Sequence, residues 1–140
     1  MIFCFLDKYR DAGLLILRVG IGVMFVFHGY PKLIAGPETW AMIGGSIKVL
    51  GIGFAQTAWG FMAALSECAG GILLVLGFLT RPACFFLLMT MVVATMMHIG
   101  KGDPFLKYSH AMESGILFLS LILIGPGKYS LDGQYRPARR

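Results

Sequence analysis

The chain has 140 residues, of which 57% are hydrophobic and only 14% charged, and its formal net charge is +5. A soluble domain carries roughly 25% charged residues, and so small a globule cannot hide this much apolar surface. The composition therefore argues against a soluble protein and predicts an integral membrane protein with one domain. Nucleic-acid binding is not expected, because the basic residues stand at the ends of apolar runs.

Four segments approach the roughly 20 apolar residues that a membrane-spanning helix needs. They cover, with approximate bounds, residues 12–34, 58–79, 82–99 and 108–124. Thr80, Arg81 and Pro82 predict a tight turn before the third segment, and Gly125-Pro126-Gly127 predicts the end of the fourth. We expect an all-α, four-helix membrane bundle. A flexible basic tail is expected over residues 133–140.

The segment from Gly36 to Thr57 is too polar to span a membrane. Apolar side chains recur in it at helical spacing: Trp40, Ile43, Ile47 and Leu50. Thr39 is a candidate N-cap residue. The pattern predicts a short interfacial helix between the first and second spans, lying over the mouth of the bundle.

The distribution of Lys and Arg predicts the orientation. One side of the bundle carries Lys8, Arg10, Arg81, Lys128, Arg136, Arg139 and Arg140. The other side carries Lys32, Lys48, Lys101 and Lys107. Because cytoplasmic loops are richer in basic residues, we expect both termini to be cytoplasmic.

Ionisable residues inside the predicted spans are the candidate functional residues, because they are costly in lipid and face the bundle interior. They are Arg18, His28, Lys32, Glu67, His98, His110 and Glu113. Helix lengths predict that His28, His98, His110 and Glu113 share one level near the outer mouth. Glu67 is expected below them, as the floor of one cavity lined by His28, Glu67, His98 and Glu113. Glu67 must be protonated or paired, and Arg18 and His28 are the partners considered.

Helix contacts are also encoded by small residues. Five positions of the first span recur at heptad-like spacing and form a seam: Arg18, Gly22, Phe25, Gly29 and Lys32. Small residues recur at four-residue spacing in the second span: Gly60, Ala64 and Cys68, and also Ser66 and Gly70. Such residues let helices approach closely in lipid.

Several motifs together carry a family resemblance. They are Arg18-Val19-Gly20 leading to Phe27-His28-Gly29-Tyr30-Pro31-Lys32-Leu33, then Glu67-Cys68-Ala69-Gly70-Gly71, Gly77-Phe78-Leu79-Thr80-Arg81, and Gly125-Pro126-Gly127-Lys128-Tyr129-Ser130-Leu131-Asp132. With these motifs the chain resembles the DoxX family of small bacterial four-helix membrane proteins. The resemblance implies the bacterial cytoplasmic membrane and a link to redox chemistry, since the related DoxD subunit belongs to a thiosulfate:quinone oxidoreductase. It supplies no catalytic motif.

The first hypothesis is a membrane subunit of a quinone-linked oxidoreductase. Quinone sites are apolar with a few placed polar groups. Glu67 and His28 are the candidate catalytic residues, and the candidate binding residues are His28, Lys32, Glu67, His98, Glu113 and Arg18. The cofactor is unknown, with a quinone as the candidate. The expected partners are the lipid bilayer, a redox subunit and further copies of this chain.

Two alternatives remain open. One is a non-catalytic anchor or assembly module for a redox complex. The other is a copper, iron or zinc site formed by His28, His98, His110 and Glu113, although no pair of these residues has a recognised metal-motif spacing. A dithiol centre is not expected, because Cys4, Cys68 and Cys84 form no C-x-x-C pair.

Overall fold

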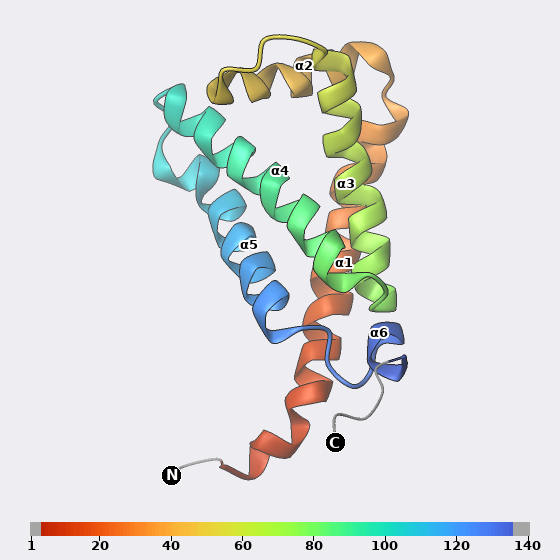
Figure 1. Ribbon diagram of the computed structural model, residues 1–140. Coiled ribbons are helices and arrows are strands. Elements are labelled where there is room, and N and C mark those ends of the chain that lie inside the picture. Colours follow the sequence, from red (N-terminus) through yellow and green to blue (C-terminus); the bar gives the residue numbers. More distant parts are fainter. Residues whose placement is uncertain (1–3, 136–140) are drawn as a thin grey trace.

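The computed structural model describes residues 4–135, and all regular structure in that part of the chain is helical (Figure 1). The prediction of an all-α chain is confirmed over these residues. Four helices are long: α1 (Arg10–Ile34), α3 (Gln56–Leu76), α4 (Thr80–Gly100) and α5 (Phe105–Ile124). The short elements are η1 (Cys4–Tyr9), α2 (Pro37–Gly44), η2 (Gly45–Leu50) and α6 (Leu131–Gln134).

Three of the described helical segments are long and apolar enough to cross a membrane. They are Leu6–Ile34, Gln56–Leu76 and Thr80–Gly100, and they contain the first three predicted spans or most of them. Helix α5 contains the fourth predicted segment but does not reach the same apolar character. Its first half carries Lys107, His110 and Glu113, and its second half is apolar apart from Ser120.

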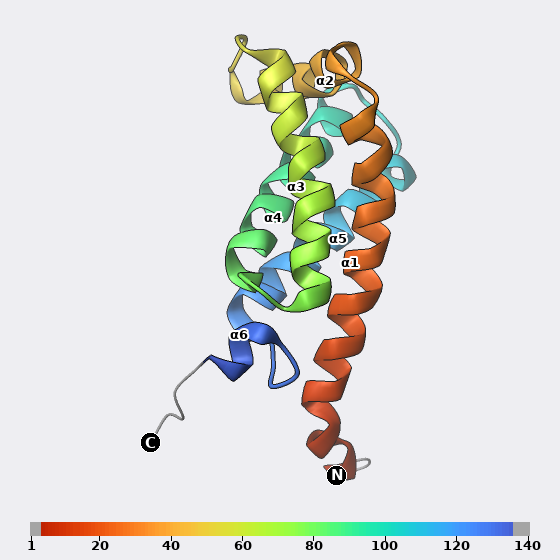
Figure 2. The same ribbon diagram turned by 90° about the vertical axis from the view of Figure 1, so that its right-hand side faces the viewer.

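The long helices pack as two pairs. Helix α1 lies along α3, and α4 lies along α5, while α3 and α4 make a smaller contact (Figure 1). Helices α2 and η2 lie across one end of the molecule, and η1 and α6 lie at the other end (Figures 1 and 2). A buried apolar core joins the two pairs and consists of Leu14, Phe25, Leu74, Cys84, Leu87, Met91, Phe118 and Leu121.

Glycine explains why α1 and α3 pack so closely. A Cβ atom on Gly22 would lie 2.6 Å from the backbone oxygen of Gly71, and one on Gly29 would collide with the backbone at Glu67 and Cys68. The predicted seam of α1 therefore faces α3. Close backbone approach at small residues is a typical way for helices to associate in lipid.

The connection between α1 and α3 differs from its prediction in detail. Gly36, with φ of +89°, is the N-cap of α2, and Pro37 is its first residue, so Thr39 lies inside the helix and is not the cap. Pro fits this position because the first helical N–H needs no partner. The predicted tail lies mostly outside the described residues, and its first residues, Gly133 and Gln134, belong to α6.

Candidate functional site: an ion pair in an apolar pocket

A partly buried ion pair joins α1 to α3. The ammonium group of Lys32, in the last turn of α1, lies 2.8 and 2.6 Å from the two carboxylate oxygens of Glu67. The Glu67 side chain is 5% exposed and that of Lys32 38% exposed. Glu67 is therefore paired, as its burial requires, but its partner is neither Arg18 nor His28. Lys32 can reach Glu67 because Gly29, one turn earlier, lets α1 pack directly against α3 at Glu67.

The same lysine also fixes helix α2. The indole Nε1 of Trp40 donates a hydrogen bond of 2.9 Å to the backbone oxygen of Lys32. Gly60 of α3 permits this arrangement, because a Cβ atom there would collide with the backbone of Trp40. Helix α2 is thereby held between the end of α1 and the start of α3, directly beside the ion pair.

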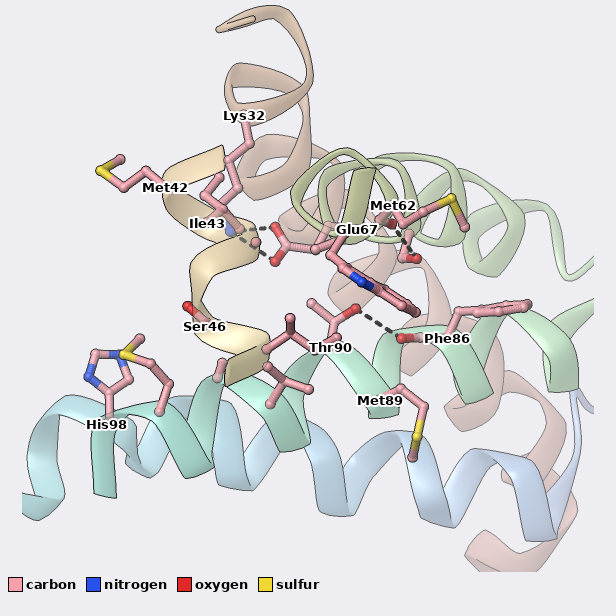
Figure 3. A pocket seen from close by; sticks show the side chains of 18 of the residues that line it. Lys32, Met42, Ile43, Ser46, Met62, Glu67, Phe86, Met89, Thr90 and His98 are labelled. Atoms are coloured by element: carbon pink, nitrogen blue, oxygen red, sulfur yellow. Dashed lines mark hydrogen bonds and ion pairs between the residues drawn. The ribbon is translucent and has the colours of Figure 1, made fainter. Parts of the chain in front are cut away.

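A half-open pocket of about 490 Å³ lies next to this pair, between α3 and α4 and beneath α2 and η2 (Figure 3). Its apolar wall comes mainly from Met42, Ile43, Ile47, Trp59, Met62, Phe86, Met89, Val93 and Met97. The ionisable residues among its lining are Lys32, Glu67, His98 and Lys101. An apolar cavity with a few polar groups is the usual form of a small-molecule site.

The histidine of the pocket belongs to a polar chain at the end of α4. The Nδ1 atom of His98 lies 2.7 Å from one carboxylate oxygen of Asp103, and the Lys107 ammonium lies 3.0 Å from the other. Hydrogen bonds from His98 and then from Lys107 hold the pKa of the Asp103 carboxyl below its usual range. Because an ionised carboxylate only accepts hydrogen bonds, Nδ1 carries the proton, and in the neutral imidazole Nε2 is the acceptor.

Sequence reasoning missed Asp103. Gly102 has φ of +72°, Gly102 N–H donates to Ile99 O, and Asp103 N–H donates to His98 O. These two bonds form a Schellman turn at the C-terminus of α4. The turn brings Asp103 back beside His98. A glycine just after a predicted helix, followed by an acidic residue, was the available signal.

Other predicted site residues lie elsewhere. His28 of α1 and His110 of α5 are exposed, with ring centroids 5.8 Å apart, and neither lines the pocket. Glu113 is also exposed and outside it. The prediction of one cavity shared by His28, Glu67, His98 and Glu113 is therefore wrong, since only Glu67 and His98 line the same pocket.

Arg18 lies away from the pocket, towards the end that carries α6. It is fully buried, and it donates hydrogen bonds to the backbone oxygens of Leu74 and Tyr129. Asp132 accepts hydrogen bonds from the N–H groups of Leu79 and Thr80, at the start of α4. These contacts join the C-terminal segment to the turn between α3 and α4, so Arg18 binds backbone rather than the pocket.

The four residues of the metal alternative do not form one cluster. His98 is bound to Asp103, whereas His28 and His110 face each other between α1 and α5. Within residues 4–135, no three His, Cys, Asp or Glu side chains are grouped closely enough to hold one ion.

The fold and the pocket together define a class: a small all-helical membrane protein with a half-open pocket beside a partly buried ion pair. The sequence matches the DoxX family over residues 13–99. The chain belongs to the DoxX family, as its motifs indicated.

The relatives span nearly the whole chain. A Haemophilus influenzae protein described as uncharacterized is 33% identical over 136 residues, covering 93% of this chain and 96% of the relative. Two Escherichia coli K12 proteins are similar, the inner membrane proteins YqjF and YphA. They are 28% and 29% identical, covering 91% and 89% of this chain and 95% and 96% of their own lengths.

Proposed function

We propose that this chain crosses the bacterial cytoplasmic membrane four times, with both termini in the cytoplasm. Two relatives are inner membrane proteins by name. Helix α5 would be the fourth span, with its apolar second half in the bilayer core and Lys107, His110 and Glu113 towards the outer side. Helices α2 and η2 would then lie at the outer interface of the membrane, because they are at the end of the molecule opposite to η1 and α6 (Figure 1).

Within that frame, we propose that the pocket binds a quinone or a similar small amphiphile as part of a quinone-linked redox system. The observation that carries this proposal is the Lys32–Glu67 pair at the wall of an apolar pocket of about 490 Å³. Ligand pockets usually measure about 300–1,000 Å³. The wall extends along α4 from Phe86 to His98, about 18 Å at 1.5 Å per residue, a length suited to an apolar tail.

The ion pair suits both redox forms of a quinone. The Lys32 ammonium has three donors and can donate to a quinone carbonyl. The Glu67 carboxylate accepts hydrogen bonds and can bind a quinol hydroxyl. His98 Nε2 provides a second acceptor on the outer side, and Asp103 and Lys107 lead from it to the surface. In this proposal a partner subunit exchanges the electrons, while this chain binds the ring and holds the protons.

Tryptophan fluorescence tests the proposal directly, because Trp59 lines the pocket. In a Trp40→Phe background, Trp59 is the sole tryptophan. We expect saturable quenching when decylubiquinone or menadione is titrated into the purified protein. Ala94→Phe, which fills the pocket, should weaken binding at least about tenfold. Ala58→Phe makes the same change on an exposed part of α3 outside the pocket and should leave the binding unchanged.

A second candidate is a non-catalytic anchor for a redox complex. It is favoured by the closed geometry of the pair, since Lys32 and Glu67 satisfy each other without a ligand. A titration in which quenching is linear and identical in all three variants would rule out the pocket as a quinone site. The anchor would then be the better account of the protein.

A further inference from the structure

The pocket beside the ion pair continues into a second hollow at the end of the molecule that carries α2 and η2. This hollow measures about 290 Å³ and lies between η2 and the last turn of α4. It shares four lining residues with the pocket: Met42, Ser46, Met97 and Lys101. The pocket and the hollow therefore form one continuous depression, here named the α3–α4 groove.

The apolar part of the groove is open to the side of the bundle. Met62 of α3 and Phe86 and Met89 of α4 line the pocket, yet their side chains are exposed. All three lie within Gln56–Leu76 and Thr80–Gly100, which are long and apolar enough to cross a membrane. In a bilayer the exposed surface of such helices faces lipid, so acyl chains can reach this part of the groove from the side.

The length of the groove is close to that of one acyl chain in a bilayer. His98 and Ser46 lie at one end of the pocket, and Phe86 and Met89 lie at the other (Figure 3). From Phe86 to His98 the helix rises about 18 Å at 1.5 Å per residue. One leaflet contributes about 15 Å, half of the hydrocarbon core. A chain can therefore extend along the pocket with its polar head at the His98 end.

The head end of the groove has unpaired positive charge. Among the charged residues near it, Lys32 is paired with Glu67, and Lys107 is paired with Asp103. Lys101 lines both the pocket and the hollow. Its ammonium group has no ion pair or hydrogen bond within residues 4–135. A lysine in this position favours an anionic ligand.

Lys48 of η2 adds a second ammonium group without a side-chain partner in the described part of the chain. Residues three apart eclipse each other in a 3₁₀-helix, so Lys48 is on the same side of η2 as Gly45, which lines the hollow. The acidic residue of α2, Glu38, is in the first turn of that helix, at the end away from η2. The hollow is therefore flanked by two lysines.

We propose that the α3–α4 groove binds an anionic phospholipid, with one acyl chain in the pocket and the phosphate in the hollow against Lys101 and Lys48. In the orientation proposed above, this lipid comes from the outer leaflet. The inference rests on the proposed role of the pocket as a site for amphiphiles. It adds a second class of occupant, which competes with the quinone for the same space.

Lipid titration followed by native mass spectrometry tests this site. The full chain is delipidated in a mild detergent and titrated with phosphatidylglycerol or with phosphatidylcholine that has the same acyl chains. We expect one phosphatidylglycerol per chain, bound at least about fivefold more tightly than phosphatidylcholine, because one lysine near an anionic lipid contributes about this factor. Lys101→Gln should remove most of this preference, and Lys48→Gln should remove part of it. Lys128→Gln changes an exposed lysine at the opposite end of the molecule and should leave the preference unchanged.

Two further arms locate the chain and identify the source of the phosphate. Ala94→Phe fills the pocket and should weaken the binding of both lipids. An excess of glycerol phosphate should leave phosphatidylglycerol bound, and its displacement would assign the hollow to a soluble phosphate and overturn the proposal.

The outcomes for the lipid and for the quinone are separable. Equal affinity for the two lipids, or a preference that survives the double Lys48→Gln, Lys101→Gln change, would overturn the lipid site even if quinone quenching of Trp59 is saturable. A lysine-dependent preference for phosphatidylglycerol without saturable quenching would support the lipid site and remove the quinone.

Discussion

The Lys32 ammonium lies 2.6 Å from one carboxylate oxygen of Glu67 and 2.8 Å from the other, although 35 residues separate the two positions. Their exposure is unequal, because the Glu67 side chain is 5% exposed and the Lys32 side chain 38% exposed. Removing one partner or the other should therefore have unequal consequences.

We expect Lys32→Met to destabilise the protein more than Glu67→Gln. The first change leaves a buried carboxylate unpaired, at a cost of up to about 3–5 kcal/mol. The second leaves a lysine whose ammonium can reach water, at a cost of about 1–2 kcal/mol. Unfolding midpoints in detergent measure the order. Lys101→Met changes an exposed lysine of the same pocket and should stay within about 0.5 kcal/mol.

Arg18→Lys should destabilise the bundle by about 1–3 kcal/mol. Arg18 bonds two backbone oxygens, those of Leu74 and Tyr129, through its two terminal nitrogens. A lysine ammonium cannot reproduce this planar fork and leaves a buried carbonyl unpaired. Arg81→Lys is the matched control, because Arg81 is exposed and donates a hydrogen bond to Ile122 O through Nε. Equal unfolding midpoints for the two variants would contradict the assigned role of Arg18.

Asp132 should act as the cap of α4. Its two carboxylate oxygens accept from Leu79 N–H at 2.9 Å and Thr80 N–H at 2.8 Å. Loss of such a cap costs about 0.5–2 kcal/mol. Chemical unfolding should rank the unaltered protein above Asp132→Asn, which keeps one acceptor, and Asp132→Asn above Asp132→Ala. If Asp132→Ala were as stable as the unaltered protein, Asp132 would not act as a cap.

Asp103 should contribute an acid-sensitive part of the stability. Hydrogen bonds from His98 and Lys107 lower the pKa of its carboxyl in the folded protein. The pKa of this carboxyl is therefore lower in the folded protein than in the unfolded chain, where it is near 4. Its contribution to stability is complete at pH values above the unfolded pKa. The contribution is lost as the pH falls through the folded pKa. Unfolding midpoints between pH 6 and pH 3 should fall less steeply in Asp103→Asn. Lys107→Met should give an intermediate slope, and a slope unchanged in both variants would argue against the prediction.

The proposed orientation predicts opposite accessibility at two exposed lysines. Lys48 of η2 should lie on the outer side of the cytoplasmic membrane, and Lys128 should lie on the cytoplasmic side. Single cysteines at these positions, in a chain whose Cys4, Cys68 and Cys84 are replaced, can be labelled in intact cells with an impermeant thiol reagent. We expect labelling at position 48 and none at position 128 until the cells are opened. The reverse pattern would invert the orientation.

The sequence by itself determined the helices and the family. Apolar runs of spanning length can only be satisfied as helices in lipid, so the long segments were predictable within a few residues. The seam of Gly22 and Gly29 was also predictable, because small residues at regular spacing are a local signal of helix contact. Motifs such as Glu67-Cys68-Ala69-Gly70-Gly71 were sufficient to indicate the DoxX family.

Only the tertiary structure decided how the polar residues are grouped. Helix length estimates the depth of a residue but not its rotation about the helix axis or the neighbour it meets. His28 and His98 were therefore predicted at one level, yet His28 turns towards His110 and His98 turns towards the pocket and Asp103. Arg18 and His28 were the predicted partners of Glu67, but the observed partner is Lys32. The close contact at Gly29 sets the register of α1 against α3 and so brings Lys32 to Glu67. Such registers arise from backbone contacts between distant segments, which no local pattern encodes.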